Sequence, residues 1–232
     1  MPSVAEGSAR DEMIAAAERV AVERGLGAMS LREVQLLSGQ RNKSAAQYHF
    51  GSRDGLIEAV VASRMGPVNE RRLALLAELD AADLPPSIAD LTTALVVPLA
   101  ERAATPSSRW ARFLSQAMAD PVLAAVVRRS FEGLSYLDVR ARLVAALDHL
   151  PADRRERRVD HATALMVVSL AAIEAQVEAT GGTTVPVPEL VDDLVAMCAA
   201  VLTAPASTGA TLLASTATTP SPISGTPTTR QE

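Results

Sequence analysis

The 232-residue chain contains a single cysteine, Cys198, and few aromatic residues, which make up only 3% of the sequence. One cysteine excludes an internal disulfide and a zinc site built on several cysteine ligands. Hydrophobic residues make up 48% of the sequence, enough for a sizeable core, and because so few of them are aromatic that core must be built mainly from Ala, Leu and Val. These small side chains let helix axes approach closely, and alanine has the highest helix propensity. The composition therefore predicts an all-α fold. The apolar neighbours of Cys198, AMCAAV, predict a buried thiol, with a redox role as the alternative.

The sequence also lacks the signatures of common enzymes and of membrane proteins. We find no G-x-S-x-G elbow, no H-E-x-x-H pair and no glycine-rich phosphate loop. No run approaches the roughly 20 apolar residues that span a bilayer. The first residues, MPSVAEGSARDE, are polar and acidic where a signal peptide is basic and then apolar. We therefore expect a cytoplasmic protein without enzymatic activity, cofactor, metal ion or membrane partner.

Positive charge is scarce but concentrated. The formal net charge is −5, and Lys43 is the only lysine. No acidic residue occurs between Glu33 and Asp54, whereas Arg41, Lys43 and Arg53 all lie in that interval. An acidic chain can hold a phosphate backbone only if positive potential is gathered locally. This interval is therefore the candidate nucleic-acid contact.

The same interval contains the residue pattern of a helix, a tight turn and a second short helix. Ser30 is a candidate N-cap, and Glu33, three residues on, predicts a reciprocal capping box. One apolar face of the first helix is formed by Leu31, Val34 and Leu37. Gly39 ends this helix, because glycine readily adopts the left-handed conformation found at helix ends. Asn42 is positioned to cap a second helix over Lys43–His49, whose small and hydrogen-bonding residues are poorly suited to a core.

Residues 10–64 resemble the DNA-binding domain of the tetracycline-repressor (TetR) family. The matching positions are Glu23-Arg24-Gly25, Ser30-Leu31-Arg32-Glu33-Val34, Gly39, Tyr48-His49-Phe50-Gly51-Ser52-Arg53 and Leu56. The chain departs from the family pattern at Gln40-Arg41-Asn42, where the turn is one residue longer. We expect this insertion to change how the second helix approaches DNA without changing its register.

Helix geometry and the matched positions together predict which residues contact DNA. Cations and hydroxyl groups at helix starts reach phosphates, which predicts that role for Lys43, Tyr48, His49 and Arg53. Glutamine pairs with adenine and alanine packs on a thymine methyl group, which makes Ser44, Ala45 and Gln47 candidates for reading base edges. Arg41 is a candidate for either role, and Arg32 and Asn42 complete the predicted DNA-contacting set. The alternative is a surface helical hairpin without function.

The rest of the chain predicts further helices around this unit. A loose arm, Met1–Ser8, precedes a helix over Arg10–Arg24, and Ser52 caps a helix toward Met65 that Gly66-Pro67 interrupts. The resemblance makes that helix the connection to the larger domain, and the interruption is either a hinge or a simple boundary. The other predicted helices are Asn69–Ala81, one from Ser87 with a kink at Pro98, one from Ser107 or Ser108, one from Asp120-Pro121 to Phe131, Leu134–Leu150, Asp153–Thr180 and Glu189–Thr203. We predict a DNA-binding domain over 8–66, a helical effector-binding and dimerisation domain over 67–204, and a disordered tail over 205–232.

Large side chains gather in one part of this second domain, namely Trp110, Phe113, Met118, Phe131 and Tyr136. They are either simple core filling or the wall of a ligand cavity. Because the resemblance implies a response to a small molecule, we predict that they contact an effector that is largely apolar. The arginine-rich run Arg154–Arg158 is interrupted by an acidic residue, and we interpret it as a solvated helix start.

The last two predicted helices are apolar on more than one face. Such helices must be covered on two sides, which fits a core on one side and a subunit interface on the other. Members of the TetR family dimerise through their last two long helices, and the candidate interface residues are Leu165, Val168, Ile173, Leu190, Leu194, Met197 and Val201.

These features predict a homodimeric, sequence-specific transcriptional regulator, a repressor released by its ligand, on a pseudo-palindromic double-stranded DNA operator. Two alternatives remain at this point. The first is a non-specific or architectural DNA-binding protein, which would bind any duplex with similar affinity. The second is a small-molecule-binding helical protein without operator specificity.

Overall fold

The computed structural model describes residues 4–205 except 41, 43, 106, 131–134 and 184, and all regular structure in that part is helical. The predicted all-α class is confirmed. The elements are α1 (Val4–Arg24), the 3-10 turn η1 (Leu26–Ala28), α2 (Leu31–Leu37), α3 (Ala45–Phe50), α4 (Arg53–Asp80), α5 (Ile88–Ala103), α6 (Trp110–Ala119), α7 (Pro121–Ser130), α8 (Ser135–Ala146), α9 (Ala152–Thr180) and α10 (Val187–Thr203). The predicted tail falls almost entirely outside the described residues.

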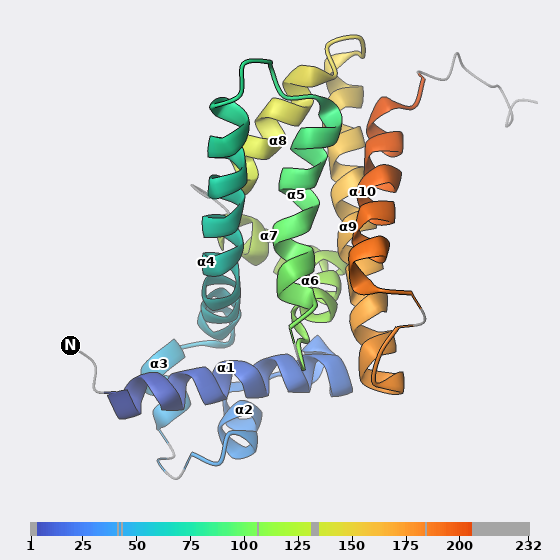
Figure 1. Cartoon of the computed structure of the whole chain (residues 1–232). Helices are drawn as coiled ribbons and strands as arrows, with labels where there is room; N and C mark the ends of the chain where they lie inside the picture. The colour runs from blue at the N-terminus through green and yellow to red at the C-terminus, as the bar shows by residue number, and fades with distance from the viewer. Residues whose placement is uncertain are drawn as a thin grey trace, which may run out of the picture.

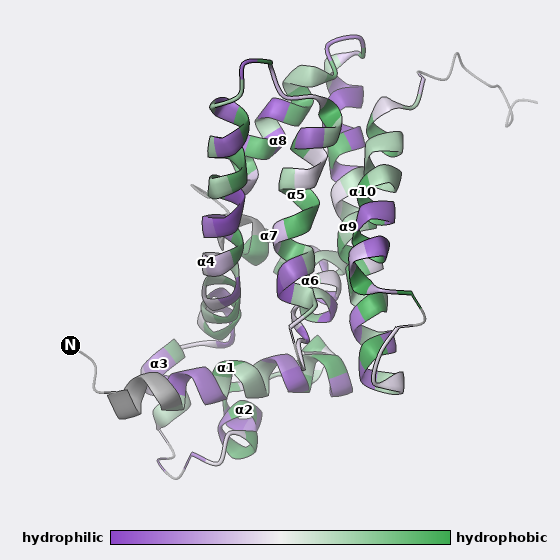
Figure 2. Cartoon of the chain, viewed as in Figure 1, coloured by the Kyte–Doolittle hydropathy of each residue, from purple (hydrophilic) through white to green (hydrophobic). Residues whose placement is uncertain are grey.

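Two groups of helices are joined by α4. Helices α1, α2 and α3 form a layer at the lower end of the molecule, and α4 rises from it into the bundle of α5–α10 (Figure 1). Helix α1 lies across this junction and contacts α4 and α6 as well as α2 and α3. Hydrophobic residues run along much of α5 and α10 in the bundle (Figure 2). The DNA-binding candidates are thus held at one end, with a large helical body above them.

Helix α1 begins at Val4, earlier than predicted, and includes most of the segment that was expected to be a loose arm. Its apolar face has the predicted spacing, and Met13, Ile14, Ala17 and Val20 are fully buried. Helices α2 and α3 and the start of α4 pack against this apolar face of α1. Gly25 follows the helix with φ 82°, so α1 ends at Arg24, the predicted position.

The predicted interruption at Gly66-Pro67 is wrong, since α4 continues through Pro67 as one helix of 28 residues. Proline removes one backbone donor and leaves the carbonyl of Ser63 without its helical partner. Burial of Met65, Val68 and Leu76 on both sides of the proline outweighs that loss. The boundary between the two predicted domains therefore lies within a continuous helix and stays a prediction.

The other helices follow the predicted order with shifted ends. Ser87 caps α5 through a complete capping box with Asp90, and Pro98 lies inside that helix. Helix α8 ends at Ala146, four residues earlier than expected. The arginine run at the start of α9 is less solvated than predicted. Arg155 donates to the carbonyl oxygen of Leu150 at 2.6 Å, and Arg158 donates to that of Leu202 at 2.9 Å.

Among the described helices, α9 alone has the length and apolar composition needed to cross a membrane, with 39% of its most apolar stretch buried in the protein. This differs from the sequence expectation because most of the charged residues of α9 gather at its start, leaving a long apolar remainder. The helix contacts α5, α6, α8 and α10, as a core helix does. Cys198 of α10 is fully buried against it, which confirms the predicted buried thiol.

Candidate DNA interface and ligand cavity

Helix α2 begins as the sequence predicts, but its cap is only half of the predicted box. The Ser30 hydroxyl accepts a hydrogen bond from the Glu33 backbone nitrogen at 3.2 Å. The Glu33 carboxylate does not return to Ser30, because it pairs with the guanidinium of Arg24 at the end of α1. The ion pair between α1 and α2 therefore replaces the second bond of the capping box, the one from the Ser30 backbone nitrogen to the Glu33 carboxylate. The end of α1 is thereby fastened to the start of α2.

The turn between α2 and α3 is held by short polar contacts. Gly39 adopts φ 69°, and the Gln40 side chain donates to Glu12 of α1 at 2.9 Å. The Asn42 side chain accepts from the Ser44 backbone nitrogen at 3.0 Å and so holds the turn before α3, but the N-cap position is occupied by Ser44 and not by Asn42 as predicted. Helix α3 itself begins two residues later than predicted, at Ala45. The predicted contacts Arg41 and Lys43 lie outside the described residues.

The two faces of α3 are clearly separated. Ala45, Ala46 and Phe50 are buried against α1, α2 and α4, whereas Gln47 is exposed and Tyr48 is 78% exposed. The prediction that Ala45 touches a thymine methyl group is therefore not supported, because only 7% of this residue is exposed. Its methyl group completes the core of the DNA-binding unit instead. Tyr48 and Gln47 are the outward side chains of α3.

The outward side chains are arranged at the C-terminal half of α3. The Gln47 amide donates to the carbonyl oxygen of Gly51 at 2.7 Å, which orients the side chain along the helix end. His49 is partly exposed, and its ring centroid lies 5.2 Å from that of Tyr48 in an edge arrangement. Ser44 at the N-cap and Arg32 on α2 are also exposed. Apart from Ala45, the described candidates lie at the surface or close to it.

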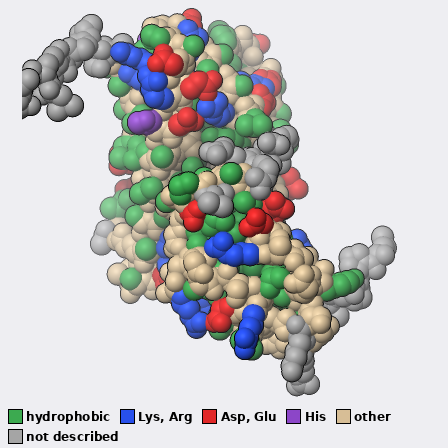
Figure 3. All heavy atoms as spheres, turned by 180° about the vertical axis from the view of Figure 1, so that it is seen from behind, with side chains coloured by type: hydrophobic (Ala, Val, Ile, Leu, Met, Phe, Trp, Pro, Cys, Tyr) green, Lys and Arg blue, Asp and Glu red, His purple; other side chains and the backbone are tan. Residues whose placement is uncertain are grey.

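Arg53 has a structural task that sequence reasoning missed. Its guanidinium donates to the carbonyl oxygens of Met29 at 3.1 Å and Leu26 at 2.8 Å. These carbonyls belong to the connection between α1 and α2, so Arg53 ties the start of α4 to that connection. Because a guanidinium has five N–H groups, these two bonds do not use all of its donors, and the phosphate contact of Arg53 stays a prediction. On the face drawn in Figure 3, basic side chains are exposed at the lower end of the molecule, the end formed by α1–α3.

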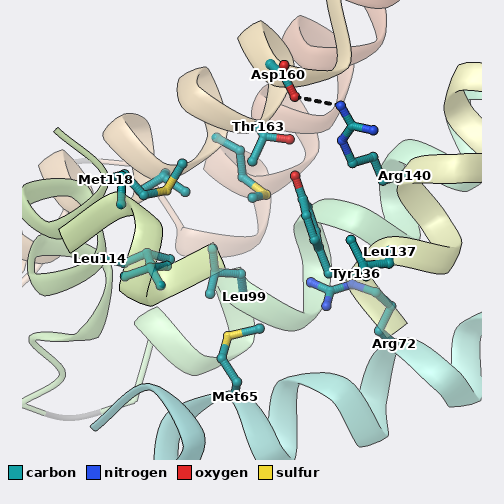
Figure 4. Close-up of a pocket in the computed structure, with 14 residues that line it drawn as sticks. Met65, Arg72, Leu99, Leu114, Met118, Tyr136, Leu137, Arg140, Asp160 and Thr163 are labelled. Atoms are coloured by element: carbon teal, nitrogen blue, oxygen red, sulfur yellow. Dashed lines mark hydrogen bonds and ion pairs between the residues drawn. The ribbon is translucent and has the colours of Figure 1, made fainter. Parts of the chain in front are cut away.

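A cavity of about 600 Å³ lies inside the helical body. It is lined by Met65, Arg72, Leu99, Leu114, Met118, Ala124, Val127, Tyr136, Leu137, Arg140, Asp160, Thr163, Met166 and Val167. Its size is that of a site for a small organic molecule. Figure 4 shows the apolar side chains of Met65, Leu99, Leu114 and Met118 toward one end and the polar groups of Arg72, Tyr136, Arg140 and Thr163 toward the other.

Only part of the predicted cavity wall lines this space. Met118 and Tyr136 do so, and Phe131 lies outside the described residues. Trp110 and Phe113 are fully buried and stack on each other, with ring centroids 5.8 Å apart. They do not line the cavity, and the core-filling alternative holds for these two residues. The presence of large aromatic side chains in a sequence does not distinguish core residues from residues that line a cavity.

Arg72 is one of the lining residues that the sequence did not indicate, and it brings a buried charge into the cavity. It lies on α4, only 2% of it is exposed, and burial lowers the pKa of its guanidinium to about 10. Its Nε donates to the carbonyl oxygen of Ala94 at 3.1 Å, and one terminal nitrogen donates to that of Leu95 at 3.3 Å. The other terminal nitrogen donates to the Ser135 hydroxyl at 3.4 Å. One sequence feature could have indicated this contact. Pro98 in α5 has no N–H for the carbonyl oxygen of Ala94, so that oxygen needs a donor from outside its own helix.

The other charged residues of the cavity form an ion-pair group at its edge. Arg140 of α8 donates to Asp160 of α9 at 3.0 Å and also pairs with Glu156. The Asp160 side chain is 59% exposed, so this group faces solvent. One guanidinium meets two carboxylates here, so the group carries a net charge of −1.

Comparison with known proteins supports the arrangement at the level of the backbone. No protein-family model matches the chain, and no curated protein matches it in sequence. A crystal structure from Rhodococcus sp., of a protein assigned to the TetR family of transcriptional regulators, has a TM-score of 0.54 at 16% identity, over 84% of this chain and 99% of that chain. AmtR of Mycobacterium smegmatis has a TM-score of 0.50 at 15% identity, over 85% of this chain and 87% of that chain. The chain has the fold of the TetR-family regulators. The fold expected from the motif over residues 10–64 is thereby confirmed.

Within this TetR-type fold, the predicted interface residues of α9 and α10 separate by burial. Val168 is 58% exposed and Met197 is 44% exposed, so both are available to a second subunit. The partly buried candidates are Leu165, Ile173, Leu190 and Val201. Leu194 is only 3% exposed, and its place in the chain's own core corrects the prediction that it lies in the interface.

Proposed function

We propose that the protein is a sequence-specific DNA-binding transcriptional regulator. The observation that carries this proposal is the pairing of α2 and α3, in which Ala45, Ala46 and Phe50 anchor α3 while Gln47 and Tyr48 face outward. A short helix presented in this way fits the major groove, which admits one α-helix and displays the pattern of base-edge donors and acceptors. The TetR-type fold supports the same function.

This surface would make two kinds of contact with DNA. Phosphates would be held by Lys43 and Tyr48, and base edges would be read by Gln47, whose amide can pair bidentately with adenine. To do so, the Gln47 amide exchanges its present bond to the Gly51 carbonyl for the base. The exposure of Tyr48, 78%, suits a phosphate contact because its hydroxyl group is accessible.

We further propose that two copies act together as a cytoplasmic homodimer on a pseudo-palindromic operator. A face of α9 and α10 leaves apolar side chains exposed, including Val168 and Met197. A second copy packed on this face would place two α3 helices on one side of the dimer. Symmetry of the protein then requires an inverted repeat in the DNA.

The position of α4 supports the further proposal that a small molecule releases the protein from DNA. Only two residues separate this helix from the end of α3, and two of its own residues, Met65 and Arg72, line the cavity. A molecule in the cavity therefore contacts the helix that carries the DNA-binding unit. Such a molecule lowers DNA affinity only if it binds the released conformation better than the DNA-bound one. In this proposal the protein is a repressor and its ligand relieves repression.

Titration of variants against a selected operator and a random duplex tests the proposal. Lys43→Ala should weaken binding to both duplexes, because phosphate contacts carry no sequence information, whereas Gln47→Ala should mainly reduce the preference for the operator. Loss of one good base contact corresponds to about 1–3 kcal/mol of discrimination. Gln116→Ala on α6 is the matched control and should change neither affinity. If the Lys43 and Gln47 variants behave alike, the division of roles is wrong.

A further inference from the structure

A buried arginine in the cavity carries a positive charge that no carboxylate of the described residues balances. Asp160, the carboxylate that lines the same cavity, pairs with Arg140 instead. Within the part of the chain that the structure describes, Arg72 is bonded to uncharged groups alone, namely two backbone carbonyls and one hydroxyl. These acceptors satisfy hydrogen bonds but leave the net charge in place. Burial of an ion without a counterion is unfavourable in a protein interior.

The geometry also leaves donors available. A guanidinium has five N–H groups, and Arg72 uses three of them in its hydrogen bonds to Ala94, Leu95 and Ser135. Each terminal nitrogen carries two hydrogens and uses one, so each retains one N–H without an acceptor among the described residues. Two N–H groups on neighbouring nitrogens match the two oxygens of a carboxylate.

The fold holds this side chain in place. Pro98 leaves the Ala94 carbonyl without a helical donor, and the Arg72 Nε supplies that bond from the facing helix. Asn69, one turn earlier on α4, accepts from the Ser135 hydroxyl at 2.9 Å and so orients the second acceptor of Arg72. The guanidinium is therefore positioned before any ligand arrives, which reduces the entropy lost on binding.

The rest of the cavity indicates what surrounds the charge. Figure 4 shows the Arg72 guanidinium beside the ring of Tyr136, while Met65, Leu99 and Leu114 extend away from it as an apolar wall. We propose that the cavity binds an organic monoanion with an apolar body, whose carboxylate pairs with Arg72. This inference rests on the proposed effector cavity and specifies its ligand as anionic, where the sequence indicated only a largely apolar molecule.

Calorimetric titration with matched acids and amides tests the charge requirement. The probes are octanoate, phenylacetate and 2-naphthoate, each compared with its primary amide, which keeps the shape and removes the charge. We expect at least one acid to bind the full-length protein about tenfold to a hundredfold more tightly than its amide at neutral pH, as a charged hydrogen-bonded pair requires. Amides that equal or exceed their acids in all three pairs overturn the inference.

Substitutions of two neighbouring arginines test whether Arg72 is the residue that pairs with the carboxylate of the ligand. Arg72→Met should abolish the preference for the acid, and Arg72→Lys should retain part of it, because lysine keeps the charge but lacks the two-pronged geometry. Arg71→Met is the matched control, since Arg71 is the preceding residue of α4, is exposed and pairs with Glu101, and should keep the full preference. An unchanged preference in Arg72→Met contradicts the proposal.

Two further results separate this inference from the proposed function. Thermal melting and binding to the selected operator show whether Arg72→Met is folded, and the acid-to-amide ratio of the unmodified protein holds even if that variant is not. If none of the six compounds binds, the anionic cavity is overturned. Operator binding by the same protein sample shows independently whether the DNA-binding function stands.

Discussion

At the scale of single residues, contacts between sequence neighbours were predictable and contacts between distant residues were not. Ser30 accepts from a backbone nitrogen three residues away, a bond that the local pattern specifies. Arg53 binds carbonyl oxygens 24 and 27 residues away, and Arg72 binds others 22 and 23 residues away. Such partners are set by how the helices pack. The sequence therefore indicated a DNA contact for Arg53 and did not identify Arg72.

Gly55 is required where α3 meets α4. A Cβ atom at this position would lie 2.1 Å from the Phe50 carbonyl oxygen, a backbone atom that cannot swing aside. We expect Gly55→Ala to lower the free energy of unfolding by about 1–3 kcal/mol, as overpacking does. DNA binding should fall as well, since the contact fixes α3 on α4. Thermal melting and duplex titration measure the two effects.

Gly66→Ala is the matched control on the same helix. Beyond its chain neighbours, a Cβ atom there meets no atom within 4 Å, and the gain in helix propensity is opposed by Pro67, which disfavours helical conformation for the residue before it, so the substitution should change stability by less than about 1 kcal/mol. Equal effects of the two substitutions would contradict the assigned role of Gly55.

Cys198 should be unreactive in the native protein. The side chain is fully buried, and burial raises the pKa of its thiol to about 11, so the reactive thiolate is scarce at pH 8. We expect a colourimetric thiol reagent to label this residue only as fast as the protein unfolds, and immediately in denaturant. Rapid stoichiometric labelling of the native protein would show that the α9–α10 contact opens readily.

At the scale of helices, the start of α6 is fastened by one carboxylate of α9. Glu174 is 3% exposed and accepts from the backbone nitrogens of Ala111 at 3.1 Å and Arg112 at 3.0 Å and from the Ser108 hydroxyl at 2.6 Å. A negative charge there also complements the positive end of the helix dipole. This interhelical cap takes the place of a local N-cap side chain, which α6 lacks.

Glu174→Gln should therefore lower stability by about 1–3 kcal/mol, because the amide turns a donor toward other donors and removes the charge. Chemical denaturation measures the change. Glu178→Gln is the control one turn later; its side chain is 46% exposed and pairs with Arg109 and Arg112, so a loss below about 1 kcal/mol is expected. A larger loss from Glu178→Gln than from Glu174→Gln would overturn this account of α6.

The sequence predicted well which segments are helical, but it predicted less well where each helix begins and ends. Capping residues such as Ser52 and Ser87 marked starts, because their side chains bond the first turn locally. Pro67 indicated an interruption that the structure does not have, because tertiary burial along α4 outweighs one missing hydrogen bond. Proline marked no break in α5 either, where Arg72 supplies a donor from the facing helix to the carbonyl left unbonded by Pro98.

At the scale of the whole molecule, the outer face of α9 and α10 should mediate dimerisation. Val168→Arg or Met197→Arg places a charge on exposed apolar surface, so we expect folded monomers in sedimentation, together with weaker operator binding. Leu73→Arg on α4 is the matched control, because Leu73 is 53% exposed and lies on another helix. Dimers that persist in both α9 and α10 variants would remove this face from the interface. Leu194→Arg should unfold the subunit, since Leu194 belongs to its core.

The cavity shows the limit of sequence reasoning at this scale. Large side chains indicated the correct domain, but only Met118 and Tyr136 of the described candidates line the space, and its buried charge comes from α4. A cavity is a gap between helices that are distant in sequence, so its wall depends on packing that local patterns do not encode.

In the proposed dimer, two symmetry-related copies of the α2–α3 unit, one from each subunit, read one DNA sequence. Selection of bound duplexes from a random pool by the purified protein, at two salt concentrations, tests this claim most directly. The account predicts enrichment of an inverted repeat at both concentrations, with weaker binding at higher salt as phosphate contacts lose their contribution. Binding without an enriched sequence, collapsing as salt rises, would mean attraction to phosphates alone and would contradict the account.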